Sequence, residues 1–187
     1  MRVVAGTYRS RQLASLHGAK LRPTSDRLRE TLFDILGPSV YGTVFLDLYA
    51  GTGAVGIEAL SRGARQVFFV ESHRAGLALI RRNLESLAIA SGAEVLPIDA
   101  VRGSALLESR GLRADFVFLD PPYGETSEYD RALEFLGGSK LLAPNGRVIA
   151  EYARKSAPSA ARTGLECVRV VEQGDAALGF YRLAARA

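Results

Sequence analysis

The sequence has one cysteine, two histidines and no long apolar run. A single cysteine, Cys167, excludes an internal disulfide, and its place in an expected strand favours a packing role over catalysis. His17 and His73 have no second ligand at the spacing of a metal site, so we expect no zinc. No apolar run approaches the roughly 20 residues that span a membrane. Because the basic N-terminus also lacks a hydrophobic segment of the signal-peptide type, we expect a cytoplasmic protein.

Acidic residues are absent from the first 25 positions, which hold these basic residues: Arg2, Arg9, Arg11, Lys20 and Arg22. The whole chain of 187 residues has a net charge of +4, so this segment accounts for the excess. A basic arm on a near-neutral body suggests a polyanionic partner, although charge alone does not distinguish it from a solvated tail. The length suits one domain, residues 1–187, with the arm over 1–24 and a core over 25–187.

Strand and helix patterns alternate through the middle of the chain. A first helix is expected between the N-cap cluster Thr24-Ser25-Asp26 and the stop signal Gly37-Pro38. Short apolar, β-prone runs predict strands at 44–48, 66–70, 94–97, 115–119 and 147–152. Helical periodicity predicts helices near 54–62, 73–88, 101–109 and 127–136. This alternation predicts an α/β fold with a mostly parallel sheet and helices on both faces.

The two ends of the chain have a different pattern. Residues 2–5 and 11–16 predict a small β-hairpin ahead of the core. Near the C-terminus, strand-like runs at 166–172 and 178–183 flank Gln173-Gly174-Asp175, a hairpin turn signal. We expect this second hairpin to form an antiparallel edge on the otherwise parallel sheet.

A glycine-rich turn follows the first of the alternating strands. Residues 51–56 match G-x-G-x-x-G between a strand and a helix, and Glu71 lies 20 residues beyond Gly51. Gly51 and Gly53 let a ligand approach the backbone, and the acid can bind ribose hydroxyls, which fits the adenosine of both S-adenosylmethionine and NAD. Asp47 beside the turn suits the amine-bearing end of S-adenosylmethionine and would repel a pyrophosphate. We therefore favour the methyl donor over NAD.

Asp120-Pro121-Pro122-Tyr123 follows another expected strand. The prolines have no N–H and leave carbonyl oxygens to accept hydrogen bonds, and the tyrosine offers a stacking face. Acceptors beside a stacking platform, with no obvious nucleophile, predict a pocket for a planar molecule bearing an NH₂ group, such as a nucleobase. Ligands of open α/β sheets bind at the carboxyl ends of strands, where Asp99 also falls. Taken singly, Glu71 and Asp99 fit a turn or helix-cap role equally well.

These motifs resemble the bacterial 16S ribosomal RNA guanine-N2 methyltransferase family (RsmD-like) over nearly the whole chain. The most specific stretches are Arg22–Glu30, Asp47–Gly53, Asp120–Tyr123 and residues 174–181. One departure is Arg9-Ser10-Arg11, where the family commonly has Arg-Gly-Arg. Serine keeps both charges but restricts the backbone.

The resemblance implies a seven-stranded, Rossmann-like methyltransferase fold with S-adenosylmethionine as methyl donor. It places Glu71 on the ribose and Asp99 near the adenine. The residues expected at the donor site are Asp47, Tyr49, Gly51, Gly53, Glu71 and Asp99. The residues expected to hold the target guanine are Asp120, Pro121, Pro122 and Tyr123. In this hypothesis the guanine NH₂ is hydrogen-bonded to the Asp120 carboxylate and the Pro121 carbonyl.

The implied partner is 16S rRNA or an assembling small ribosomal subunit, bound by a monomer without a metal ion. We expect RNA contacts at Arg9, Arg11, Arg22 and Arg27. Arg27 lies on a helix and has acidic neighbours with which it could pair instead. Other functions stay open: an amino-methyltransferase acting on DNA adenine or protein glutamine, an NAD oxidoreductase, and a non-catalytic RNA-binding or ribosome-assembly module.

Overall fold

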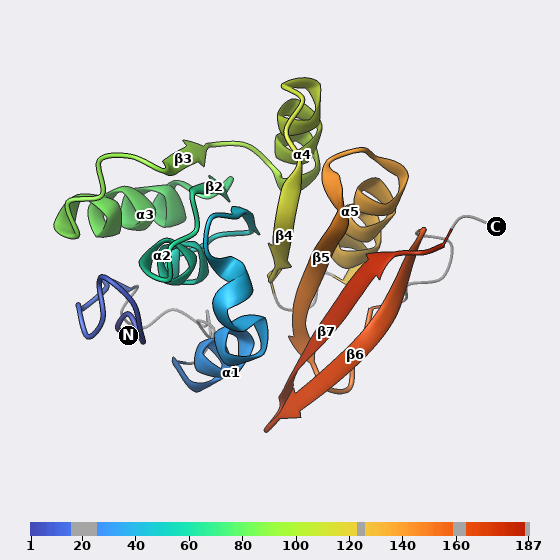
Figure 1. Ribbon diagram of the computed structural model, residues 1–187, viewed down its shortest axis with the longest axis horizontal. Helices are drawn as coiled ribbons and strands as arrows, with labels where there is room; N and C mark the ends of the chain where they lie inside the picture. The colour runs from blue at the N-terminus through green and yellow to red at the C-terminus, as the bar shows by residue number, and fades with distance from the viewer. Residues whose placement is uncertain (16–25, 123–125, 159–163, 186–187) are drawn as a thin grey trace.

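A seven-stranded sheet with the order β3-β2-β1-β4-β5-β7-β6 forms the centre of the protein. The computed structural model describes residues 1–15, 26–122, 126–158 and 164–185. The strands are β1 (Val44–Leu48), β2 (Gln66–Val70), β3 (Ala93–Leu96), β4 (Ala114–Leu119), β5 (Leu142–Ala153), β6 (Leu165–Gln173) and β7 (Ala176–Leu183). Figure 1 shows the β6–β7 hairpin at one end of the molecule and β3 near the other.

The first five strands run parallel, and β7 is antiparallel to both β5 and β6. The predicted mixed sheet with an antiparallel C-terminal edge is therefore confirmed. Chain order reverses where β1 lies between β2 and β4, which makes the carboxyl ends of β1 and β4 the switch point at which α/β sheets bind ligands.

Helices cover both faces of the sheet, as predicted (Figure 1). They are α1 (Asp26–Leu36), α2 (Ala54–Ser61), α3 (Arg74–Ser86), α4 (Ala100–Ser109) and α5 (Thr126–Gly138), with a short 3₁₀ helix at Gly37–Val40. Within β1, Phe45 packs in a core with α1, α2 and α3, whereas Leu46 and Leu48 pack in a second core with α4 and α5. Alternate side chains of one strand thus enter two different cores, which explains why β1 is apolar almost throughout.

Most predicted boundaries lie within two residues of the observed ones, and the main difference is at β5. The predicted strand covered residues 147–152, whereas β5 begins at Leu142. Its early part includes Pro144-Asn145-Gly146, which reads locally as a turn. The pairing of Ala114 with Leu142 extends the strand there, and the β4–β5 register shifts before Phe116.

The predicted N-terminal hairpin is not seen as a pair of strands. Before residue 16 the structure has no strand and only an isolated antiparallel bridge between Arg2 and Gln12. The backbone N–H groups of Val4 and Ala5 instead donate to the Glu58 carboxylate of α2, at 2.8 and 3.0 Å. Met1 and Val3 still exchange backbone hydrogen bonds with residues 10–13, but because α2 takes the donors of Val4 and Ala5, the pairing does not continue past Val3. The N-cap residues Thr24 and Ser25 lie outside the described residues.

Neither a membrane-spanning helix nor a cluster of metal ligands is present among the described residues. In that part of the chain, no helix is both long and apolar enough to cross a membrane. In the same part, no three His, Cys, Asp or Glu side chains gather as a group that could hold a metal ion.

Candidate active site

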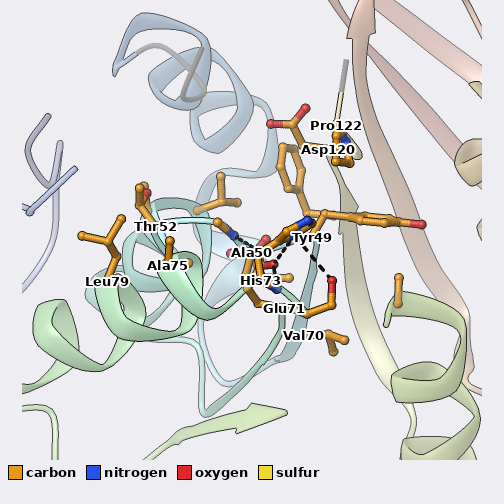
Figure 2. A pocket seen from close by; sticks show the side chains of 18 of the residues that line it. Tyr49, Ala50, Thr52, Val70, Glu71, His73, Ala75, Leu79, Asp120 and Pro122 are labelled. Carbon is orange, nitrogen blue, oxygen red and sulfur yellow. Dashed lines mark hydrogen bonds and ion pairs between the residues drawn. The ribbon is translucent and has the colours of Figure 1, made fainter. Parts of the chain in front are cut away.

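A cavity of about 500 Å³ lies at the carboxyl ends of β1, β2 and β4. Seven of the predicted site residues line it: Asp47, Tyr49, Gly51, Glu71, Asp99, Asp120 and Pro122. Gly53 and Pro121 are absent from the lining, and Tyr123 lies outside the described residues. In Figure 2, Asp120 and Pro122 lie at one side of the cavity and Thr52, Ala75 and Leu79 at the other. The fold therefore brings the two predicted half-sites together in one space.

The turn between β1 and α2 depends on residues with positive φ. Gly51 and Gly53 have φ of 55° and 76°, and Tyr49 has φ of 62° although it is not glycine. A Cβ on Gly53 would lie 3.2 Å from a side-chain carbon of Ile80. Gly53 thus has a packing role behind the turn, whereas Gly51 faces the cavity.

Asp47 is a buried carboxyl group at the base of this turn. It is 2% exposed, and its Oδ2 accepts a hydrogen bond of 2.9 Å from the Gly56 N–H in the first turn of α2. Burial raises the pKa of Asp47 from 3.8 to about 8; the Gly56 bond lowers this pKa, and the nearby Glu71 charge raises it. Asp47 therefore holds the start of α2 and keeps an acidic group poised to ionise beside a cation.

Glu71 follows β2 and joins two loops across the cavity floor. Its Oε2 accepts from the Gly51 N–H at 2.7 Å, and its Oε1 accepts from the His73 N–H at 2.7 Å. These bonds match the turn role considered from the sequence, and the side chain also lines the cavity. The Glu71 Oε1 also lies 3.2 Å from His73 Nδ1, whereas Oε2 has a lone-pair site left that can accept a hydrogen bond from a ligand hydroxyl.

Asp99 caps α4, which was the other role considered for it. Its Oδ1 accepts a 3.0 Å hydrogen bond from the Arg102 N–H, and its Oδ2 lies 3.3 Å from the Arg102 Nε. The residue is also part of the cavity wall. Capping fixes the direction of the carboxylate, so the structural role and a ligand-binding role are compatible here.

Tyr49 connects the glycine turn to α5 through a residue that the sequence analysis missed. Its hydroxyl donates to Glu128 Oε2 at 2.9 Å, and Arg131 Nη1 lies 2.5 Å from the other oxygen of the same carboxylate. Burial, and then the hydrogen bond to Glu128, raise the pKa of the Tyr49 hydroxyl above its ordinary value. The tyrosine stays neutral and remains a donor to Glu128, which itself lines the cavity.

The arginines predicted to contact RNA are exposed where the structure describes them. Arg9, Arg11 and Arg27 are exposed, and Arg22 lies outside the described residues. Arg11 donates from Nη2 to the Ser86 carbonyl at the end of α3, at 3.0 Å.

Comparisons with known proteins give the family. The family described as Conserved hypothetical protein 95 matches residues 1–182 of this chain. Ribosomal RNA small subunit methyltransferase D of Haemophilus influenzae is 36% identical over 152 residues, which are 81% of this chain and 78% of that protein. The chain belongs to the RsmD family. The Escherichia coli protein of the same name is 39% identical over 123 residues, 66% of this chain and 60% of that one.

Solved structures agree with this assignment. The yhhF structure from Escherichia coli has a TM-score of 0.83 at 28% identity and covers 100% of this chain and 99% of that chain. SMU.776, solved in complex with SAH, has a TM-score of 0.68 at 17% identity over 84% of this chain and 48% of that chain. At that lower identity the likeness shows a shared fold.

Several cavity residues of this RsmD family member were not predicted from the sequence. They are Ser15, His73, Ala75, Leu79, Ile98, Phe118 and Glu128 among others. Position relative to strand ends could have indicated Ile98 and Phe118, because each lies within two residues of a predicted strand end. Nothing local marks Ser15 or Glu128, because their places depend on how the N-terminal segment and α5 pack.

Proposed function

We propose that this RsmD family member transfers a methyl group from S-adenosylmethionine to the exocyclic N2 amine of a guanine in 16S rRNA. The observation that carries the proposal is the single cavity shared by the glycine turn with its acids and by Asp120 and Pro122. Support for the acceptor comes from the Haemophilus influenzae relative, which is named as a small-subunit ribosomal RNA methyltransferase.

The cavity residues fit the parts of S-adenosylmethionine. A volume of about 500 Å³ is within the usual range for ligand pockets. The Asp47 carboxylate suits the ammonium group of the donor, a remaining lone pair of Glu71 suits a ribose hydroxyl, and the Asp99 carboxylate suits the amino group of a purine. When bound, the donor supplies an activated methyl group on a sulfonium. NAD fits less well, because a pyrophosphate at the glycine turn would be repelled by the Asp47 carboxylate.

Asp120 has the chemistry needed on the acceptor side. The guanine NH₂ is a poor nucleophile because its lone pair is delocalised into the ring. A carboxylate that accepts an N–H from this group orients it and stabilises the positive charge that grows on nitrogen as the new N–C bond forms; the methyl–sulfur bond of the sulfonium would break in the same step and leave a neutral thioether. The proton then lost from nitrogen passes to Asp120 or to water. No covalent bond between enzyme and substrate is required.

The Pro-Pro-Tyr segment completes the proposed base pocket. Pro122 lines the cavity, and Pro121 is buried beside it, with its carbonyl as the proposed second acceptor for the NH₂. Tyr123 is proposed to stack on the guanine, a contact typically of about 1–3 kcal/mol. The guanine must leave its own stack to enter such a pocket, as in other base-modifying enzymes.

Methyl transfer to RNA tests the proposal directly. The protein is incubated with S-adenosylmethionine labelled in its methyl group and with undermethylated 16S rRNA or small-subunit particles, and the modified base is mapped. We expect label on a guanine N2. Asp120→Asn should lower transfer about 100-fold or more while calorimetric affinity for the donor is retained. Asp130→Asn, an exposed acid on α5, is the matched control and should transfer normally.

Other outcomes would replace the proposal. Transfer to adenine in DNA or to glutamine in a peptide, but not to RNA, would reassign the acceptor. RNA binding without any donor binding would indicate a non-catalytic RNA-binding module. Full activity of Asp120→Asn would show that the catalytic role given to this carboxylate is wrong.

A further inference from the structure

The exposed face of α3 has three arginines without an acidic partner among the described residues. Arg74, Arg81 and Arg82 are all exposed, and none forms an ion pair with any described acid. Arg74 and Arg81 are seven residues apart, so they lie on the same side of the helix about 10 Å from each other along its axis. Only Glu85 adds an acidic side chain to this face.

Several arginines of the C-terminal half have acidic partners. Ion pairs with acids are formed by these arginines of the C-terminal half: Arg102, Arg110, Arg131, Arg154 and Arg182. Residues 1–92 hold 12 lysines and arginines against 7 acids, whereas residues 93–187 hold 12 against 13. In the first half Asp47, Glu58 and Glu71 are buried, so few of its acids offset the positive surface.

The N-terminal segment is attached to α3, so Arg11 belongs to the same surface. Arg11 donates to the Ser86 carbonyl at the end of α3. Further along, the buried Asn83 accepts from the Ala14 N–H at 2.7 Å and donates to the Ala14 carbonyl at 3.2 Å. Its amide also donates to the Thr52 carbonyl in the glycine turn at 2.9 Å. One side chain of α3 therefore holds both the N-terminal segment and the donor-binding turn.

The same helix leads to the cavity. Its first turns supply Ala75 and Leu79 to the cavity lining, and both lie at the edge of the cavity in Figure 2. Arg74, next to Ala75, therefore lies at the cavity end of the arginine row. Ser15, one residue beyond the Asn83 contact, also lines the cavity. The basic surface thus extends from Arg11 along α3 towards the site of chemistry.

We propose that the exposed face of α3 binds RNA, with Arg74, Arg81 and Arg82 contacting phosphates of the strand that flanks the target guanine. Arg9 and Arg11 continue this contact at the far end of the helix. The inference rests on the proposed function, since it names the surface by which an RNA substrate reaches the cavity. Arginine suits this role because its planar fork of N–H donors matches a phosphate group.

The test compares two double substitutions with the same change in charge. Arg81→Gln with Arg82→Gln removes two positive charges from the α3 face and keeps good helix formers. Arg113→Gln with Arg169→Gln removes two exposed arginines of the C-terminal half that form no ion pair with a described acid. Affinity for an undermethylated 16S rRNA fragment is measured over a series of salt concentrations, and donor affinity is measured by calorimetry.

We expect the α3 variant to lose about 1.4 from the slope of log affinity against log salt, about 0.7 for each single-strand phosphate contact. Its RNA affinity should fall several-fold more than that of the control pair, with donor affinity unchanged in both. Equal effects of the two double substitutions on RNA affinity would refute RNA binding by α3 and leave the proposed function unaffected. If the unmodified protein transferred no methyl group to RNA, the proposed function itself would be refuted.

Discussion

Asp47→Asn should stabilise the unliganded protein while weakening donor binding. Burial raises the pKa of the Asp47 carboxyl from 3.8 to about 8, so the folded protein keeps a proton that the unfolded chain has already lost at neutral pH. Asparagine has nearly the same shape, is neutral at every pH, and its amide oxygen can still accept from the Gly56 N–H. The substitution removes the free energy of protonating or burying the acid and leaves the hydrogen bond to α2 in place.

The size of the effect follows from the two pKa values. Between 3.8 and about 8 the folded state binds more protons than the unfolded state, so the stability of the unmodified protein falls as the pH rises through this window. At about 1.36 kcal/mol per pKa unit, the acid at position 47 lowers the free energy of unfolding by roughly 1–2 kcal/mol at pH 5. The decrease is about 4 kcal/mol at pH 7 and between about 5 and 6 kcal/mol above pH 8. These are upper limits, because asparagine also has a desolvation cost. If Asp47→Asn recovers half of the decrease at pH 7, about 2 kcal/mol, its Tm should rise by about 4–8 °C.

The assay is thermal unfolding of both proteins without ligand at pH 5, 7 and 8.5. We expect Asp47→Asn to have the higher Tm at pH 7 and the difference in Tm to grow with pH. Asp130→Asn, at an exposed position, should show no such growth. In calorimetry at pH 8.5, Asp47→Asn should bind S-adenosylmethionine about 10- to 100-fold more weakly, the usual loss for a charged hydrogen bond. A difference in Tm that stays constant from pH 5 to 8.5 would refute the burial argument.

Three further substitutions test how the N-terminal segment is held. Gly6→Ala would place a Cβ 1.8 Å from the Ser61 carbonyl oxygen at a φ of +80°, so we expect a loss of about 1–3 kcal/mol in urea unfolding; an unchanged midpoint would contradict the close approach. Ser10 has φ of 67°, and Ser10→Gly should raise the free energy of unfolding by up to about 1 kcal/mol, whereas a decrease would rule out strain there. Asn83→Leu removes the bonds to Ala14 and the glycine turn, so calorimetric donor affinity and protection of the first 15 residues from proteolysis should fall together. Loss of protection with full donor affinity would show that Asn83 does not couple the two.

Much of the fold was predictable because its signals are local. The strands at 44–48 and 66–70 have the predicted bounds, since each is a short run of β-prone apolar residues between turn signals. The hairpin at Gln173-Gly174-Asp175 forms as predicted, with Gly174 at a φ of 62°. The predicted N-terminal strands do not extend past Val3 because Val4 and Ala5 donate to Glu58, which is more than 50 residues away and outside any local pattern.

The candidate site also has features that local sequence predicts and features that only the tertiary structure shows. The sequence by itself determined which chemical groups follow the strand ends, because a glycine turn, a capping acid and a Pro-Pro pair act through neighbouring backbone atoms. Only the tertiary structure decided that Asp47 is buried with a raised pKa, that Glu128 receives the Tyr49 hydroxyl, and that α3 joins the N-terminal segment to the cavity. Burial, charge interaction and hydrogen bonding across long stretches of chain depend on distances in space, which follow from the packing of helices and strands and not from the order of residues along the chain.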